Sequence, residues 1–309
     1  MSNRRGSTVR GIALAAVLGL AATSHPARAQ GLTYDMKTTG QFEDPRGGQP
    51  MVRTFMAGHG QFAGGKSRID YTESAAPSGP TRAGTYMITN GATRTTWMVD
   101  PAKREYAEFN AEELAKTAED AQKALGGLAK TEMTNINVTS EELGAGESIG
   151  GYATVKYRIT EGFTMSISVM GQKSQSVSHS TIDLWVTPEL DGAMDPVGRA
   201  AAGGGGATAA LTAEVAKAYT KVRKGVVLRT IITTESTTGA KKSSHIMTTE
   251  ISNVKRGGVA SSVFDVPSGY TKVDALTSIM GGAPGGDTAR AGLDAARRAL
   301  RDLKRRPPA

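Results

Sequence analysis

Apolar and polar residues alternate along most of the chain with the period of two that is typical of β-strands. In residues 153–160 the odd positions are apolar or aromatic and the even positions are polar, and the alternation resumes in residues 163–169. We interpret Glu161-Gly162, between these runs, as the turn of a β-hairpin. Strands with one apolar face predict an antiparallel sheet with the other face in water. Further strands are predicted at residues 33–43, 51–63, 66–73, 84–90, 94–99, 132–140, 181–186, 226–236 and 244–254.

Three segments show apolar residues at helical spacing instead. The first covers residues 110–125 and begins at Asn110, a favourable N-cap residue. The second covers about residues 208–224, after a glycine-rich stretch at residues 198–206. The third covers residues 287–305. The pattern therefore predicts a mainly β, α+β protein with a few helices beside the sheet.

The first 29 residues have the composition of an export signal. Three arginines precede an apolar run, residues 12–22, that is short for a membrane span, and Ala27-Arg28-Ala29 fits a small-x-small cleavage site. A non-cleaved anchor is the alternative. The chain has no cysteine, hence no lipid-attachment cysteine and no disulfide. We expect a mature chain that begins at Gln30 and lies in the periplasm or outside the cell.

The formal charge of +8 belongs to the two ends of the chain. Residues 1–29 hold four arginines and no acidic residue, and residues 287–309 hold seven basic against three acidic residues. Residues 30–286 are therefore neutral, which gives no support for nucleic-acid binding by the body. We predict one domain over residues 30–280 and a glycine-rich linker with a basic helix over 281–309.

The basic tail has two interpretations. Residues 287–306 could form an interfacial helix that contacts an anionic membrane weakly, because its apolar face is mostly alanine with three leucines. The other interpretation is a solvated helix that docks on the body of the protein, or a partly disordered extension.

Residues 60–67 match the letters of a nucleotide-binding P-loop, with Gly60, Gly65, Lys66 and Ser67 at the required spacing. A P-loop needs a helix at its exit so that the helix N-terminus can hold phosphate. Here residues 68–71 read as a strand, and prolines follow closely. We interpret Gly64-Gly65-Lys66 as a hairpin turn.

No other catalytic or metal-binding pattern survives inspection. Ser178-His179 and Asp183 have the residue types of a hydrolase triad, but on a strand His179 and Asp183 point away from Ile182 and Leu184. No Gly-x-Ser-x-Gly motif occurs, and the four histidines lack metal-ligand spacing. We predict no catalytic residue, no metal and no cofactor, and hence a protein that is not an enzyme.

Methionine is frequent in the predicted strands. Aromatic residues make up only 5% of the chain, so methionine could simply fill the core. Its flexible thioether could equally line a site for an irregular apolar ligand. Both interpretations remain open for Met36, Met51, Met56, Met87, Met98, Met165, Met170 and Met247.

Six blocks along the chain carry a resemblance to a known family: residues 66–71, Asn90-Gly91, residues 97–101 with Tyr106, residues 150–157, residues 183–190 and residues 264–270. Together these blocks resemble the lipoprotein-localisation-factor (LolA/LolB-like) superfamily. Their order and spacing are similar to the early strands, the middle strands and the closing phrase of these domains, over roughly residues 31–275. An uncharacterised family of secreted bacterial proteins carries the same set, and the chain is most similar to that family.

The resemblance implies a strongly curved antiparallel sheet, a half-open barrel, with helices across its concave face. Such a surface suits acyl chains, and in the localisation factors the ligand is the acyl part of a lipoprotein. The glycine-rich insertion at 198–206 and the basic tail depart from that family's pattern.

The sequence therefore leads to two hypotheses. The first is a non-catalytic periplasmic or secreted protein that binds a lipid or the acyl chains of a lipoprotein on the concave face. The second is a ligand-free interaction module of the cell envelope that acts through its surface and basic tail. Under the first hypothesis the side chains expected to face inward, toward the ligand or the helices, are Phe163, Met165, Ile167, Val169, Ile182, Leu184 and Val186.

Overall fold

The computed structural model contains one large sheet and one α-helix in the part of the chain that it describes. That part comprises residues 29–43, 49–76, 79–110, 129–169, 172–190, 209–222 and 225–275. The strands are β1 (Ala29–Phe42), β2 (Met51–Ala63), β3 (Lys66–Ser74), β4 (Tyr86–Asn90), β5 (Thr95–Asp100), β6 (Glu105–Asn110), β7 (Ala129–Ala145), β8 (Val155–Val169), β9 (Gln172–Thr187), β10 (Val226–Thr238), β11 (Lys241–Val259) and β12 (Thr271–Val273). The helices are α3 (Ala209–Tyr219) and the short 3₁₀ helix η2 (Ser261–Phe264).

The sheet consists of two meanders joined edge to edge. Strands β1 to β6 follow one another on one side, and β7 to β11 do the same on the other. The pairing of β1 with β11 joins them, from Ala29 opposite Val259 to Phe42 opposite His245. Neighbouring strands are antiparallel except for β12, which pairs with β6 in parallel. The prediction of a mainly β protein is confirmed, with one large mixed sheet that is not closed into a barrel.

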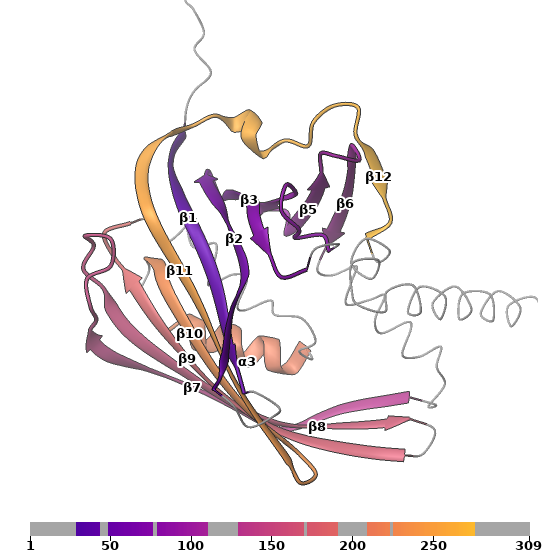
Figure 1. The fold of residues 1–309 in the computed structure, drawn as a ribbon. Helices are drawn as coiled ribbons and strands as arrows, with labels where there is room; N and C mark the ends of the chain where they lie inside the picture. Colours follow the sequence, from indigo (N-terminus) through magenta and orange to yellow (C-terminus); the bar gives the residue numbers. More distant parts are fainter. Residues whose placement is uncertain are drawn as a thin grey trace, which may run out of the picture.

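The sheet is strongly bent, and α3 lies against one of its faces (Figure 1). We call the face that carries α3 the inner face. The helix packs against β7 and β8, and its Leu211, Val215 and Ala218 are buried. The helix predicted at about 208–224 is therefore present, although it ends earlier, at Tyr219. The helices predicted at 110–125 and 287–305 lie outside the described residues, apart from Asn110, which is the last residue of β6.

The opposite face of β3 to β5 is covered by the segment that follows β11. Phe264 of η2 is buried there with Tyr86, Ile88 and Val99. Arg68 anchors this segment, since its guanidinium donates to the carbonyl of Val263 at 3.2 Å. The chain then reaches the edge of the sheet as β12 (Figure 1).

The turn predicted at Glu161-Gly162 is wrong. Strand β8 runs through both residues, with Glu161 opposite Ser180 and Gly162 opposite His179. The side-chain period explains the error, because Ile159, Glu161 and Phe163 keep the same parity and no residue is inserted. Gly162 also lacks the positive φ that a tight hairpin turn needs. The two runs are thus one central strand between β7 and β9.

The turn predicted at Gly64-Gly65 is confirmed. Both glycines have positive φ, 59° and 76°, and they connect β2 directly to β3. No helix follows, so the match to the P-loop letters has no structural counterpart. The strands at 51–63 and 66–73 were predicted closely, whereas β6 and β12 were not predicted as strands.

Candidate functional site: the inner face of the sheet

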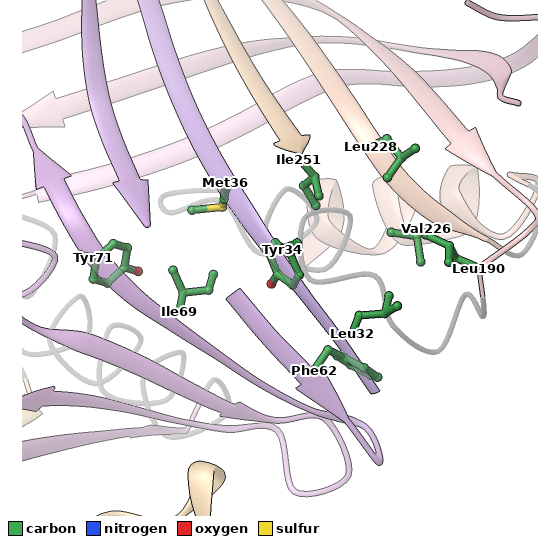
Figure 2. Packing of buried hydrophobic residues seen from close by; sticks show 10 residues of the cluster. All are labelled: Leu32, Tyr34, Met36, Phe62, Ile69, Tyr71, Leu190, Val226, Leu228 and Ile251. Carbon is green, nitrogen blue, oxygen red and sulfur yellow. The ribbon is translucent and has the colours of Figure 1, made fainter. Parts of the chain in front are cut away.

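A cluster of ten buried side chains forms the centre of the inner face where the two meanders meet. Tyr34 of β1 lies over Gly60 of β2, where any side chain would collide, since an added Cβ would come 2.0 Å from the phenol ring. Glycine at this position therefore lets an aromatic ring lie flat on the sheet. Figure 2 shows the cluster, which consists of Leu32, Tyr34, Met36, Phe62, Ile69, Tyr71, Leu190, Val226, Leu228 and Ile251.

Three methionines surround this cluster without being fully covered. Met56, Met87 and Met98 are half-buried and pack against it. Met87 and Met98 are neighbours on β4 and β5. The hydroxyl of Tyr71 donates to Met87 Sδ at 3.8 Å, and burial raises the pKa of Tyr71 to about 12, so the phenol stays neutral. This part of the inner face is thus an adaptable apolar surface with partly exposed sulfur atoms.

The predicted lining residues divide into two groups. Ile182, Leu184 and Val186 are buried on the inner face with Tyr157 and Ile159 of β8, and the same cluster contains Ala218 of α3. Their present contact is therefore with the helix.

The other four predicted lining residues lie on the distal half of β8. Phe163 and Met165 are half-buried, and Ile167 is 37% exposed. Val169 pairs with Gln172, but its side chain lies outside the described residues. We call the paired residues 163–169 of β8 and 172–178 of β9 the β8–β9 arm. The four positions have the same parity as Tyr157 and Ile159, so the inner face continues along this arm.

A polar pair separates the two apolar groups. Glu161 is opposite Ser180, whose Oγ lies 3.1 Å from Thr234 Oγ1 on β10. Burial raises the pKa of Glu161, and the hydrogen bond with Ser180 opposes this shift only in part. The sequence interpretation missed Glu161 because it was assigned to a turn. Its parity with Ile159 was the signal that would have placed it on the inner face.

Asp183, the acid of the rejected hydrolase triad, lies on the opposite face and is held by two cations. Arg158 Nε donates to its carboxylate at 2.7 Å, and Lys156 Nζ lies at 2.9 Å. Burial alone would raise the pKa of Asp183, but the hydrogen bonds and charges of Arg158 and Lys156 lower it. Asp183 therefore acts as an ionic cross-link between β8 and β9, and His179 is on the exposed part of β9.

A second polar group on the opposite face links β1, β2 and β11. His59 Nδ1 lies 2.5 Å from Asp35 Oδ1, and Asn253 Nδ2 donates to Asp35 Oδ2 at 2.7 Å. The hydrogen bonds with Asn253 and His59 lower the pKa of Asp35. Asn253 adopts a left-handed φ of 52° at the irregularity in the β1–β11 pairing. No sequence motif marked these residues, since they are 24 and 218 positions apart.

Two further observations concern the described residues only. No group of three or more His, Cys, Asp or Glu side chains among them is arranged to hold a metal ion. No helix in this part of the chain has both the length and the apolar character needed to cross a bilayer.

The family model for a domain of unknown function, DUF4412, matches residues 54–270, which span most of β2 through η2. The chain belongs to this family. A search of curated proteins gives no match. The expectation of an uncharacterised domain family is thus confirmed, while kinship with the lipoprotein-localisation factors remains part of the proposal below. In this DUF4412 protein the matched span contains the three half-buried methionines and the inner face of β8 and β9, whereas Leu32, Tyr34 and Met36 of β1 precede it.

Proposed function

We propose that this DUF4412 protein is a non-catalytic carrier that holds a lipid, or the acyl chains of a lipoprotein, against the inner face of its sheet. The signal-like sequence of residues 1–29 supports a location in the periplasm or outside the cell for the proposed carrier. The proposal extends the resemblance to lipoprotein-localisation factors, whose curved sheets bind acyl chains.

The observation that carries the proposal is the half-buried state of Met56, Met87 and Met98. A methionine that only filled the core would be covered on all sides, as Met36 is with 7% exposure. The three partly exposed side chains instead offer apolar surface beside a preformed aromatic cluster. Covering such a surface with an acyl chain contributes about 0.8 kcal/mol for each CH₂ group that leaves water.

The β8–β9 arm provides a second apolar surface on the same face of the sheet. Phe163, Met165 and Ile167 follow one another on the inner face of β8, and serines of β9 lie opposite all three. Between the arm and the methionines, α3 covers the buried cluster of β8 to β10. In the proposed carrier α3 acts as a lid, and a ligand that spans the whole inner face has to displace it.

The first test is to purify the mature protein from its native compartment, extract it with organic solvent and search for lipid by mass spectrometry. The proposal expects a stoichiometric acyl species. Well-folded protein without lipid would contradict it and would favour the ligand-free interaction module, whose own test is deletion of residues 281–309.

A matched pair of variants tests the face that binds. Ile167 and Val177 are 37% and 39% exposed on the neighbouring strands β8 and β9, but they point to opposite faces. We expect Ile167→Asp to reduce co-purified lipid at least about tenfold, because a carboxylate on the inner face must be desolvated by the ligand. Val177→Asp is the control and should leave the lipid content unchanged.

Equal lipid content in folded Ile167→Asp and Val177→Asp proteins would exclude the arm from the site. Circular dichroism and thermal melting of both variants show that any loss of lipid does not come from unfolding.

A further inference from the structure

An aromatic cluster with one cation lies at the end of the β1–β2 hairpin that is remote from the Tyr34 cluster. Phe42 and Phe55 have ring centroids 5.4 Å apart, and His245 stacks on Phe42 at 6.1 Å with an interplanar angle of 14°. The guanidinium carbon of Arg53 lies 5.2 Å from the centroid of Phe42 and 4.9 Å from that of Phe55. The two rings thus hold the guanidinium of the exposed Arg53 side chain close to this position.

The register places this cluster on the inner face. Arg53 is opposite Gly40 of β1, which has the same parity as Tyr34, Met36 and Thr38. Gly40 is required here, because an added Cβ would lie 2.3 Å from the ring of Phe55. The ring of Phe55 therefore rests on Gly40, and Arg53 lies beside it at the rim of the apolar surface.

Arg53 ends a row of apolar residues that crosses the sheet. The row runs from Ile182 through Ile232, Met247 and Gly40 to Arg53, each residue directly opposite the next on the neighbouring strand. Ile232 and Met247 are only half-buried. Three strand spacings separate Ile232 from Arg53, about 14 Å, which is close to the hydrocarbon thickness of one bilayer leaflet, about 15 Å. An extended acyl chain therefore matches the length of this row, whose far end at Ile232 packs against the cluster that contains Ala218 of α3.

The charge of Arg53 is not neutralised within the described part of the chain. Other arginines of the sheet bind carboxylates: Arg68 contacts Asp70, Arg82 contacts Asp100, Arg158 contacts Asp183, and Arg229 contacts Glu147 and Glu250. Arg53 forms no ion pair with a described residue, and no described residue accepts a hydrogen bond from its guanidinium. A planar fork of donors that is already held in place suits a carboxylate or a phosphate.

We propose that Arg53, oriented by Phe42 and Phe55, binds the anionic head group of an acyl ligand whose chain lies along the row toward Ile232. This inference rests on the proposed carrier function and narrows it to anionic amphiphiles with a carboxylate or phosphate head. The aromatic rings orient the guanidinium, the guanidinium binds the head group, and Met247 and Ile232 contact the chain.

The test compares three probes with the same alkyl chain, dodecanoate, dodecyl phosphate and dodecanol, by displacement of a fluorescent fatty-acid analogue from the mature protein. We expect the wild-type protein to bind at least one anionic probe at least about tenfold more tightly than the alcohol. Arg53→Gln should remove this preference and leave alcohol binding within about twofold. Arg53→Lys should retain part of it, since the charge remains but the fork is lost.

Lys37→Gln is the matched control, because it removes one positive charge from an exposed position of β1 with the opposite parity. It should leave both the affinities and the preference unchanged. A loss of anion preference in Lys37→Gln equal to that in Arg53→Gln would overturn the proposal, because it would show an effect of net charge alone.

The outcomes separate this inference from the carrier function. If all three probes bind equally well, the head-group site is wrong and the carrier function stands. If none of them binds, the carrier function fails as well. Binding of inorganic phosphate with the affinity of dodecyl phosphate would also overturn the inference, since the chain would then contribute nothing. Retained alcohol binding by Arg53→Gln shows that the variant is folded.

Discussion

At the scale of single residues, the inner face depends on glycines that make room for aromatic rings. The ring of Tyr34 occupies the space above Gly60, and the ring of Phe55 occupies the space above Gly40. The residue with the smallest side chain thus determines where the largest side chains pack. These glycines lie inside strands, where glycine is otherwise unfavourable, and the bound rings are the physical reason for their presence.

Gly60→Ala provides a direct test of this packing. The new methyl group would overlap the ring of Tyr34, so we expect a loss of about 1–3 kcal/mol in the free energy of unfolding. Gly257→Ala is the matched control, because Gly257 also lies in a strand but an added Cβ meets no atom within 4 Å. The control should be neutral or stabilising by up to about 1 kcal/mol. Similar urea midpoints for the two variants would contradict the packing argument.

Glu161 makes the stability of the protein depend on pH. Its pKa is raised above the ordinary value of 4.5, mainly by burial, so the folded state binds the proton more tightly than the unfolded state. The stabilising contribution of the protonated form is complete below pH 4.5 and is lost as the pH rises through the raised pKa. Glutamine at this position imitates the protonated form and still accepts a hydrogen bond from Ser180.

We therefore expect Glu161→Gln to raise the melting temperature at pH 7.5 by about 1–3 °C and to leave it nearly unchanged at pH 4. Thermal melts at both pH values measure this difference. The exposed Glu235 of β10 provides the control, and Glu235→Gln should change neither melt. An equal shift for Glu161→Gln at both pH values would mean that the effect is not due to ionisation.

At the scale of elements, α3 determines how much of the inner face is accessible. Ala218 lies in the buried cluster of Tyr157, Ile159 and Leu184, whereas Ala216, on the same helix, is exposed. Intrinsic helix propensity contributes little to the stability of a short helix. The buried apolar stripe of α3 is therefore what holds the helix on the sheet.

Ala218→Asp should therefore undock α3, because it brings an unpaired carboxylate into the apolar cluster. We expect a loss of about 2–4 kcal/mol in stability and increased binding of a hydrophobic dye. Ala216→Asp is the control on the same helix and should behave as wild type. Unchanged dye binding in a folded Ala218→Asp protein would show that α3 does not cover an apolar surface.

At the scale of the whole molecule, two meanders form one sheet because β1 pairs with β11. This pairing joins segments more than 200 residues apart, as the hydrogen bond between Thr38 and Thr249 shows. Several strands were predicted because alternation is a local property, and residues 51–63 are an example. The partner of β1 was not predicted, because strand pairing depends on contacts between residues distant in sequence.

The candidate site shows the same division. Alternation along the strand grouped Phe163, Met165 and Ile167 on one face of β8. In the same way it grouped Ile182, Leu184 and Val186 on one face of β9, and both groups lie on the inner face. Parity did not show that α3 covers the second group and leaves the first accessible. Arg53 and Glu161 were missed, because alternation does not reveal their partners. These are the rings of Phe42 on β1 and Phe55 on β2 for Arg53, and the Ser180–Thr234 pair of β9 and β10 for Glu161.

The sequence by itself determined the mainly β fold class, most of the strands and the residues of β8 and β9 that share a face, because a side-chain period of two follows from local backbone geometry. Only the tertiary structure decided which strands are neighbours, which apolar residues are covered and which charges have partners. Those properties arise when side chains from distant segments meet, and no local pattern records them. In this DUF4412 protein, local alternation therefore indicates which residues share the inner face, and tertiary packing decides which of them remain exposed.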